Sequence, residues 1–265
     1  MAGRLDLELV NRGLAKSREK AKAFIKDEKV YINNIMATKA SISVSDSDVL
    51  EIRGEVDRYV SRGGYKLEKA VNEFDLSLSG KMCMDIGAST GGFTDCMLKN
   101  GASHVYAIDV GHDQLDESLA SDSRVTSMEG VNFRYMEKGD IDDLIDFASA
   151  DVSFISLKHI LTPAYEMLSD TGEMVCLVKP QFEAGKEHIN KKGVVKEEKI
   201  HVKILRETVE MAESIGFSVK NLTYSPIKGP EGNIEYLLYI SKEKGEKGIL
   251  VNAANTVKEA FTDLG

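Results

Sequence analysis

The sequence of 265 residues has little of what a disulfide framework, a zinc site or a membrane anchor requires. Its three cysteines, Cys83, Cys96 and Cys176, are an odd number without CxxC spacing, and its five histidines are scattered singly. This distribution favours buried, reduced thiols and no metal site. No apolar run approaches the length of a membrane-spanning helix, and the opening MAGRLDLELV lacks the apolar stretch of a secretory signal. We therefore expect a cytoplasmic protein that does not enter a membrane.

Charge is unevenly distributed along the chain. The total is −9, but residues 1–40 hold nine Lys and Arg against five Asp and Glu, a net of +4, which leaves −13 on the remainder. A small basic module attached to an acidic body would produce this asymmetry, and a partly solvated helical face would produce a similar count. The length and a hydrophobic content of 42% suffice for one α/β core and a small extra module.

Residues 1–58 have the pattern of a compact module. Apolar residues recur at helical spacing up to Gly13, and a second helical pattern begins near Ser17. Short strands are predicted at residues 30–32 and 49–52. The second helical pattern also carries a row of cations, spaced four residues apart beside its apolar stripe.

The stretch RGLAKSREKAKAFI followed by a short strand resembles the S4 RNA-binding domain. That family usually has glycine after the asparagine that ends the strand, where this chain has Asn34, and asparagine tolerates the left-handed turn. The resemblance implies phosphate contacts, which position RNA without reading its sequence, and assigns them to Arg4, Arg12, Arg18, Lys22 and Lys39. Ordinary surface charge is the better explanation for any one of these taken alone.

From about residue 64, short apolar runs alternate with amphipathic helices. Strands are expected at residues 82–86, 105–108, 125–128, 152–155, 174–178, 218–224 and 234–240, and helices at 92–99, 157–168 and 199–215. This order predicts an open, mostly parallel, doubly wound α/β sheet of the Rossmann type.

A glycine-rich stretch, MDIGASTGGFTD, joins the first of these strands to the next helix. Such a turn lets backbone approach a ligand, although its spacing does not match GxGxxG. Asp109 ends the second strand, where an acid accepts the ribose hydroxyls of an adenosine in both NAD enzymes and methyltransferases. The form D-x-G-x-x-x-G beginning at Asp85 resembles the methyltransferase version. The alternative is that Asp109 only caps the following segment, and that Asn132 is a turn asparagine.

Four ionisable residues lie at or near the carboxyl edge of the expected sheet: Lys66, Asp151, Lys179 and Glu235. Lys179 ends an apolar strand and Glu235 lies inside one, where an unpaired charge is costly, so both need partners. A structural ion pair explains any one of them in isolation. Together they resemble the Lys-Asp-Lys-Glu tetrad of ribose 2′-O-methyltransferases.

Five separated motifs, VSRGGYKL, DIGASTGGFTD, DVSFISL, KPQFEAGK and GNIEYLLY, follow the S4-like segment. In this order they resemble the TlyA family of ribosomal RNA methyltransferases, in which an S4 domain precedes an FtsJ-like domain. The resemblance implies a small α+β S4 domain at residues 1–58, a linker at 59–64, a Rossmann-like class I methyltransferase domain at 65–242 and a tail at 243–265. It also implies methyl transfer from S-adenosylmethionine to the ribose 2′-hydroxyl of cytidine in ribosomal RNA or ribosomal subunits. The cofactor residues would be Asp85, Gly87, Ala88, Ser89, Thr90, Gly91, Gly92, Phe93, Asp109, Val110 and Asn132.

Lys179 is the candidate base, since a ribose hydroxyl must lose its proton as it attacks. A lysine base must be partly neutral, which desolvation or the nearby Lys66 would favour, while Asp151 and Glu235 orient it. Alternatively, the lysines stay charged and stabilise the developing alkoxide. Further RNA contacts are expected from Arg62, Lys186, Lys191 and Lys192, although disorder without RNA is an equally good account of the loop at 184–196.

Two other classes of function compete with this interpretation. Members of the family often carry the name hemolysin, which suggests a membrane-active protein, but the absence of a spanning segment and the acidic body argue against direct lysis. An RNA-binding protein with an inactive methyltransferase fold would bind the cofactor without turnover, and the complete tetrad argues against it. The sequence leaves the oligomeric state open.

Overall fold

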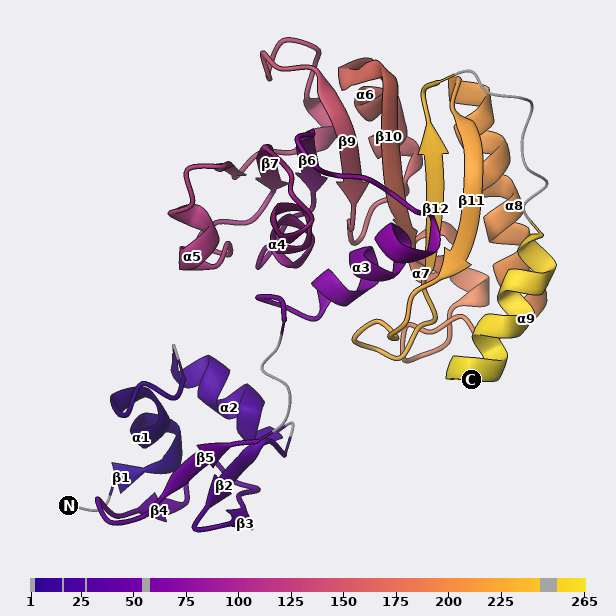
Figure 1. Ribbon diagram of the computed structural model, residues 1–265. Coiled ribbons are helices and arrows are strands. Elements are labelled where there is room, and N and C mark those ends of the chain that lie inside the picture. The colour runs from indigo at the N-terminus through magenta and orange to yellow at the C-terminus, as the bar shows by residue number, and fades with distance from the viewer. Residues whose placement is uncertain (1–2, 16, 27, 54–57, 244–251) are drawn as a thin grey trace. The chain divides into compact units, whose positions relative to one another are not determined.

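The computed structural model describes residues 3–15, 17–26, 28–53, 58–243 and 252–265. The chain divides into two compact units, Met1–Arg58 and Tyr59–Gly265 (Figure 1). Parts of two predicted regions, residues 54–57 of the S4-like segment and 244–251 of the tail, lie outside the described residues.

In the first unit, two helices pack against small antiparallel sheets. Its elements are β1 (Gly3–Arg4), α1 (Leu5–Asn11), α2 (Arg18–Lys26), β2 (Val30–Ile32), β3 (Ile35–Met36), β4 (Ser43–Val44) and β5 (Leu50–Ile52). Strand β2 lies between β3 and β5, and β1 pairs with β4. Leu9, Phe24 and Val30 belong to its buried core. Asn33 and Asn34 make the turn after β2 at φ of 48° and 68°, so the predicted left-handed turn is confirmed.

The second unit alternates strands and helices along most of its length. Its first half holds α3 (Gly63–Glu73), β6 (Met82–Ile86), α4 (Gly92–Lys99), β7 (His104–Asp109), α5 (Glu117–Ala120), β8 (Val125–Glu129), the 3-10 helix η1 (Phe133–Tyr135) and β9 (Ile145–Ala150). Its second half holds α6 (Lys158–Met167), β10 (Leu168–Val178), α7 (Pro180–Glu183), η2 (Lys186–His188), α8 (Glu198–Ile215), β11 (Ser218–Tyr224), β12 (Tyr236–Ser241) and α9 (Ala253–Leu264). The three helices predicted in this region are confirmed to within one residue at each end.

Seven strands of this unit form one sheet in the order β11-β12-β10-β9-β6-β7-β8. Strand β12 runs antiparallel to both of its neighbours, and the remaining pairs are parallel. The doubly wound, mostly parallel sheet predicted from the sequence is therefore confirmed.

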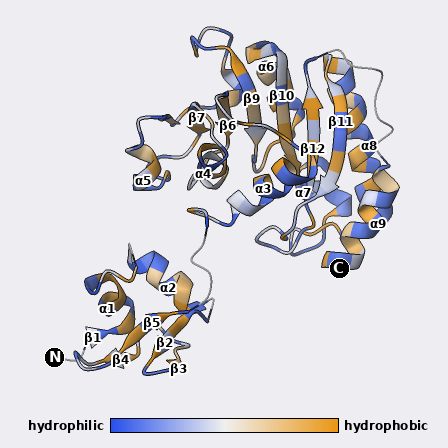
Figure 2. Cartoon of the chain, in the orientation of Figure 1, coloured by the Kyte–Doolittle hydropathy of each residue, from blue (hydrophilic) through white to orange (hydrophobic). Residues whose placement is uncertain are grey.

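Helices cover both faces of the sheet. Leu161 of α6, Ile204 of α8 and Val257 of α9 are buried in the core on one face. Leu67 of α3 and Met97 of α4 are buried in the core on the other. Figure 2 shows alternating hydrophobic and hydrophilic bands along α8 and α9, as expected for helices with one face on a core. The central strands therefore have both faces buried, which leaves the ends of these strands open to a ligand.

One predicted strand is wrong. The expected strand at residues 152–155 is irregular backbone, and β9 occupies Ile145–Ala150 instead. The true strand is rich in small residues, with Ala148, Ser149 and Ala150 all completely buried. Because large apolar residues are the usual signal of a buried strand, the strand was predicted on the loop that follows β9 and not on β9 itself.

Residues 59–64, predicted as a linker, pack as part of the second unit. Tyr59 is 2% exposed and belongs to its core, and its ring meets Tyr65 edge to face at 5.3 Å. Helix α3 already begins at Gly63. The aromatic ring of Tyr59, which a flexible linker does not need, explains the difference.

Candidate active site

The strand ends that carry the candidate residues meet at one edge of the sheet. Ile86 of β6 pairs with Ala150 of β9, so the glycine loop and Asp151 leave the sheet side by side. Because β12 is antiparallel to β10, its first residue, Tyr236, lies opposite the last residue of β10, Val178. The sequence predicted Glu235 inside a strand. The structure instead places it immediately before β12, at the same edge of the sheet.

The structure brings the four tetrad residues together. Lys66 Nζ lies 2.6 Å from Glu235 Oε2 and 3.9 Å from Asp151 Oδ2, and Lys179 Nζ lies 2.6 Å from Asp151 Oδ1. Lys179 and Glu235 thus both have partners, as predicted, although not each other. The Lys179–Asp151 contact is an ion pair whose angle is not that of a hydrogen bond.

Burial makes this cluster different from surface ion pairs. The side chains of Lys66 and Lys179 are 9% and 10% exposed, and that of Glu235 is 1% exposed. Two lysines facing two carboxylates balance in formal charge, which such burial requires. Asp151, at 21%, is the more accessible acid. The cluster is therefore closed on the protein side and reachable at Asp151.

The segment after Asp151 adds residues that the sequence analysis missed. Lys179 Nζ donates to Ser153 Oγ at 3.0 Å. Phe154 is 91% exposed at a φ of 63° and lies 5.0 Å, ring to ring, from Phe182 of α7. A large aromatic side chain that is exposed and has a left-handed backbone indicates a binding role rather than a packing role.

Glu183, at the end of α7, holds this segment in place. Its Oε2 accepts from Ser156 Oγ at 2.7 Å, and its Oε1 accepts from the Leu157 backbone N–H at 2.8 Å, at the start of α6. Lys179 and Glu183 are four residues apart in KPQFE, with Lys179 directly before the short helix α7 and Glu183 at its end. That spacing was the signal in the sequence from which Glu183 could have been found.

The glycine loop after β6 approaches the start of the Asp151 segment closely. Gly87 has a φ of 83°, and a Cβ there would lie 2.6 Å from the Asp151 backbone oxygen, so no other residue fits. Asp109 Oδ2 accepts from the Ser89 N–H at 2.8 Å, and its Oδ1 accepts from the Gly111 N–H at 2.7 Å. Asp109 therefore orders the backbone of the glycine loop at Ser89 and of its own following segment at Gly111. The second contact is the capping role considered above.

Other predicted cofactor residues divide into exposed and buried ones. Ser89, Thr90, Val110 and Asn132 are exposed, and Asn132 also caps η1 by accepting from the Arg134 N–H at 3.2 Å. The buried ones are Ala88, Gly91, Gly92 and Phe93. Phe93 is 3% exposed in the core, so only its backbone is available to a ligand.

Asp85 has no exposed surface and supports the loop from beneath. Its Oδ2 accepts from the backbone N–H and the hydroxyl of Thr94, at 2.8 and 2.7 Å, and its Oδ1 accepts from Ser149 Oγ at 2.9 Å. Burial raises the pKa of Asp85 to about 6, against these hydrogen bonds, which lower it. The prediction that Asp85 contacts the cofactor is replaced by a positioning role, because its carboxylate is enclosed.

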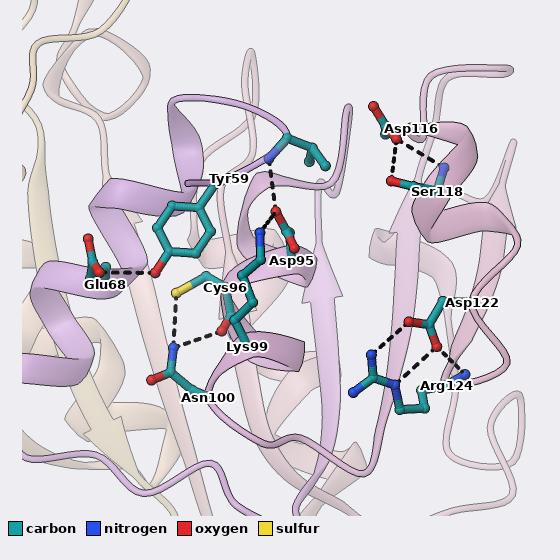
Figure 3. Close-up of polar contacts among 11 residues, drawn as sticks. Tyr59, Glu68, Asp95, Cys96, Lys99, Asn100, Asp116, Ser118, Asp122 and Arg124 are labelled. Carbon is teal, nitrogen blue, oxygen red and sulfur yellow. Dashed lines mark hydrogen bonds and ion pairs between the residues drawn. The ribbon is translucent and has the colours of Figure 1, made fainter. Parts of the chain in front are cut away.

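The start of α3, which carries Lys66, is fastened to α4 (Figure 3). The Val60 N–H donates to Asp95 Oδ2 at 2.9 Å, and Lys99 Nζ contacts the same oxygen at 2.8 Å. The Tyr59 hydroxyl donates to Glu68 Oε1 at 3.1 Å. These contacts set where α3 begins and so help to place Lys66 at the sheet edge.

In the first unit, the predicted RNA residues have different environments. Arg12 donates to the backbone oxygens of Asp48 and Ser45 at 2.6 and 2.8 Å, and it contacts Glu8 at 3.3 Å. Its guanidinium is therefore ordered by contacts within the unit, and its expected role on RNA stays a prediction. Lys22 and Lys39 are exposed.

Arg4 and Arg18 share one buried carboxylate. Each lies 2.9 Å from an oxygen of Asp6, which is itself fully buried, while their own side chains are 50% and 47% exposed. The acid orders two arginines that still face solvent. Arg62, Lys186, Lys191 and Lys192, in the second unit, are also exposed.

Comparisons with known proteins match both units. The family model described as FtsJ-like methyltransferase matches residues 59–242, and the S4 domain model matches residues 3–50. A Mycobacterium tuberculosis (strain ATCC 25618 / H37Rv) protein named 16S/23S rRNA (cytidine-2'-O)-methyltransferase TlyA is 40% identical over 238 residues, 89% of each chain. Hemolysin A of Brachyspira hyodysenteriae is 43% identical over 237 residues, 89% of this chain and 98% of that protein. A solved structure described as a "putative hemolysin" from Streptococcus thermophilus has a TM-score of 0.80 and 45% identity, and the match covers 99% of this chain and 96% of that one.

Proposed function

Because this chain belongs to the FtsJ-like methyltransferase family and carries an S4 domain, we propose that it methylates the ribose 2′-hydroxyl of cytidine in ribosomal RNA. The M. tuberculosis relative carries that activity in its name. The observation that supports the proposal most strongly is the closed cluster of Lys66, Asp151, Lys179 and Glu235 at the sheet edge. Ribosomal subunits are the proposed form of the substrate.

The residues at the glycine loop fit S-adenosylmethionine. Gly87 allows the backbone to approach Asp151, and Ser89 and Thr90 of the same loop are exposed. Asp109 ends β7 where an adenosine ribose would be bound. When bound, the cofactor supplies an electrophilic methyl group on its sulfonium.

Lys179 is the cluster residue proposed to act on the 2′-hydroxyl. Its contacts with Asp151 and Ser153, at 2.6 and 3.0 Å, stabilise a charged ammonium. The geometry therefore favours a lysine that stabilises negative charge developing on the ribose oxygen over a neutral lysine that takes the proton. A rate that falls at high pH supports the charged role, whereas a rate that rises as Lys179 loses its proton supports the base.

The surroundings of the cluster suit an RNA substrate. Phe154 offers an exposed ring next to Ser153, and unstacked bases bind by stacking on such rings. We assign RNA binding by the S4 domain, in residues 1–58, to Arg4, Arg18, Lys22 and Lys39. The charged groups of these side chains are accessible to RNA phosphates. Residues 59–265 would then hold the cofactor and carry out the transfer.

The test is methyl transfer from labelled S-adenosylmethionine to unmodified ribosomal subunits, with labelled nucleosides identified by mass spectrometry. We expect label in 2′-O-methylcytidine with the wild type and its loss with Lys179→Ala. Lys81→Ala is the matched control, because Lys81 forms an ion pair with Glu173 away from the site edge and should retain activity. Absence of label from the wild type, with cofactor binding shown by calorimetry, would remove this function and favour a binding-only protein.

The name of the Brachyspira relative raises membrane activity as a second candidate. Among the described residues, no helix is both long and apolar enough to cross a bilayer. Leakage of dye from liposomes is the direct test. Leakage that persists in Lys179→Ala would establish a membrane activity separate from methyl transfer.

A further inference from the structure

A tight turn in the second unit presents two lysines. Asn190 Oδ1 accepts from the Lys192 N–H at 2.8 Å and from the Val194 N–H at 3.1 Å, and the Gly193 N–H donates to the Asn190 backbone oxygen at 2.9 Å. Gly193 has a φ of 77°, which other residues rarely adopt. The Asn190 side chain and the backbone of the turn therefore build it together, and the side chains of Lys191 and Lys192 are exposed at its tip.

Asn233 anchors this turn to the protein. Its side chain is 1% exposed, its Nδ2 donates to the Gly193 oxygen at 2.9 Å, and its Oδ1 accepts from the Val195 N–H at 3.2 Å. Its amide supplies both the donor and the acceptor that these two backbone groups need. An apolar replacement would leave both backbone groups without this partner.

His201 of α8 makes a second connection between the turn and β12. Its Nε2 lies 2.9 Å from the Val195 oxygen, which can only accept, so this nitrogen carries the proton. Its Nδ1 then accepts from the Tyr236 hydroxyl at 2.7 Å. Burial lowers the pKa of His201, which keeps this neutral form.

Both connections reach the segment that holds Glu235. Asn233 lies two residues before it and Tyr236 directly after it, and Glu235 in turn holds Lys66 at 2.6 Å. The turn that carries Lys191 and Lys192 is thus joined to the strand end that carries a tetrad acid. Among the described residues, no carboxylate lies within ion-pair distance of either lysine, so both heads are available to phosphates.

We propose that Asn233 is a positioning residue that holds the Asn190–Val195 turn so that Lys191 and Lys192 grip RNA phosphates at a set place relative to Glu235. This inference rests on the proposed function. Asn233 acts through the two lysines, and it touches neither substrate nor cofactor. It therefore governs how tightly RNA binds and leaves the rate of transfer from the bound complex unchanged.

The test is a double-mutant cycle on methylation of unmodified ribosomal subunits. Lys191→Ala with Lys192→Ala should raise KM about tenfold and reduce the slope of log affinity against log salt by roughly 1–2. Asn233→Ala should raise KM similarly while kcat stays within about twofold. In the Asn233→Ala background, the lysine changes should then cost no more than about twofold. Full additivity, or a fall in kcat at unchanged KM, would overturn the proposal.

Two further variants keep the test decisive. Asn221→Ala is the matched control, because Asn221 is exposed on β11 and its side chain accepts from the N–H of its neighbour Leu222. If Asn233→Ala does not fold, Gly193→Pro disrupts the turn at the surface, since proline lacks the N–H and cannot adopt that φ. It should raise KM to the same degree, and an unchanged KM would contradict the proposal.

Failure of the proposed function is distinguishable from failure of this inference. If the wild type binds subunits without methylating them, the first proposal fails, and the salt slope of binding still reports on the turn. A slope lowered equally by Asn233→Ala and by the lysine changes supports the inference. An Asn233→Ala slope equal to that of the wild type rejects it.

Discussion

Asp6 in the first unit and Asp85 in the second have no exposed surface, yet their environments act on them in opposite directions. Hydrogen bonds from Arg4 and Arg18 hold the pKa of Asp6 well below its usual range. Asp85 has only hydroxyl and backbone donors, so burial raises its pKa to about 6. Burial alone therefore does not decide the charge of a carboxyl group, because the charge of its partners outweighs it.

The same difference separates the roles of the two units. In the first unit, the buried acid holds two half-exposed arginines outward, which suits phosphate binding. At the sheet edge the lysines themselves are buried beside Asp151 and Glu235, which suits work on a single bound hydroxyl. Changing Asp to Asn at three positions, one in each environment, tests this comparison.

The largest effect is expected from Asp151→Asn. This change leaves two buried lysines without the carboxylate that they share, so kcat should fall by about 10²-fold to 10⁴-fold. Single-turnover methyl transfer measures the loss, and calorimetry should show cofactor binding retained. Activity within a few-fold of the wild type would place the chemistry elsewhere. Lys81→Ala again serves as the control for loss of an ion pair away from the site.

Asp85→Asn should change how stability depends on pH. The folded state of the wild type binds a proton between about pH 4 and pH 6 that the unfolded state has lost, so wild-type stability falls as pH rises through this window. The variant cannot lose this proton, so its free energy of unfolding should rise relative to that of the wild type by roughly 2–3 kcal/mol between these pH values. Urea unfolding at pH 4, 5, 6 and 7 measures it. Parallel curves for the two proteins would contradict a raised pKa.

Asp6→Asn should show the opposite pH dependence. The folded-state pKa is lowered, so the stability contributed by Asp6 is present above about pH 4 and is lost as pH falls through the folded-state value. Near neutral pH the variant should lose about 1–2 kcal/mol, a modest amount because both arginines are half exposed. The deficit should shrink in acid, which unfolding of the first unit monitored across pH would reveal. A deficit that grows in acid would rule out this account.

The smallest effect is expected at Lys22. Its exposed head is assigned one phosphate contact, so Lys22→Ala should weaken RNA binding a few-fold and lower the salt slope by about 0.7–0.9. Arg12→Ala is the paired variant, and it should destabilise the first unit because its guanidinium binds backbone oxygens. Equal stability of the two variants would contradict the distinction drawn between them. Titrations of ribosomal subunits at several salt concentrations give the slopes.

Long periodic segments were predictable because they depend on local pattern. Helix 92–99 and strand 218–224 occur at the predicted residues. The strand at 152–155 failed because the second half of the true strand, Ala148–Ala150, consists of small residues, of which Ser149 packs against Asp85. Hydrophobic size is a poor guide where space, and not apolar area, limits the choice of residue.

By itself, the sequence predicted the class of the sheet, because strand and helix periods are local properties. It also singled out the four ionisable residues, which their resemblance to a known tetrad grouped together, although it misplaced the strands beside Asp151 and Glu235. Only the tertiary structure decided that Lys179 pairs with Asp151 while Lys66 pairs with Glu235. It also decided that Asp85 is enclosed and that Asn233 holds a turn forty residues away in the chain. Pairing energies depend on distance and burial, which arise only when distant segments pack together.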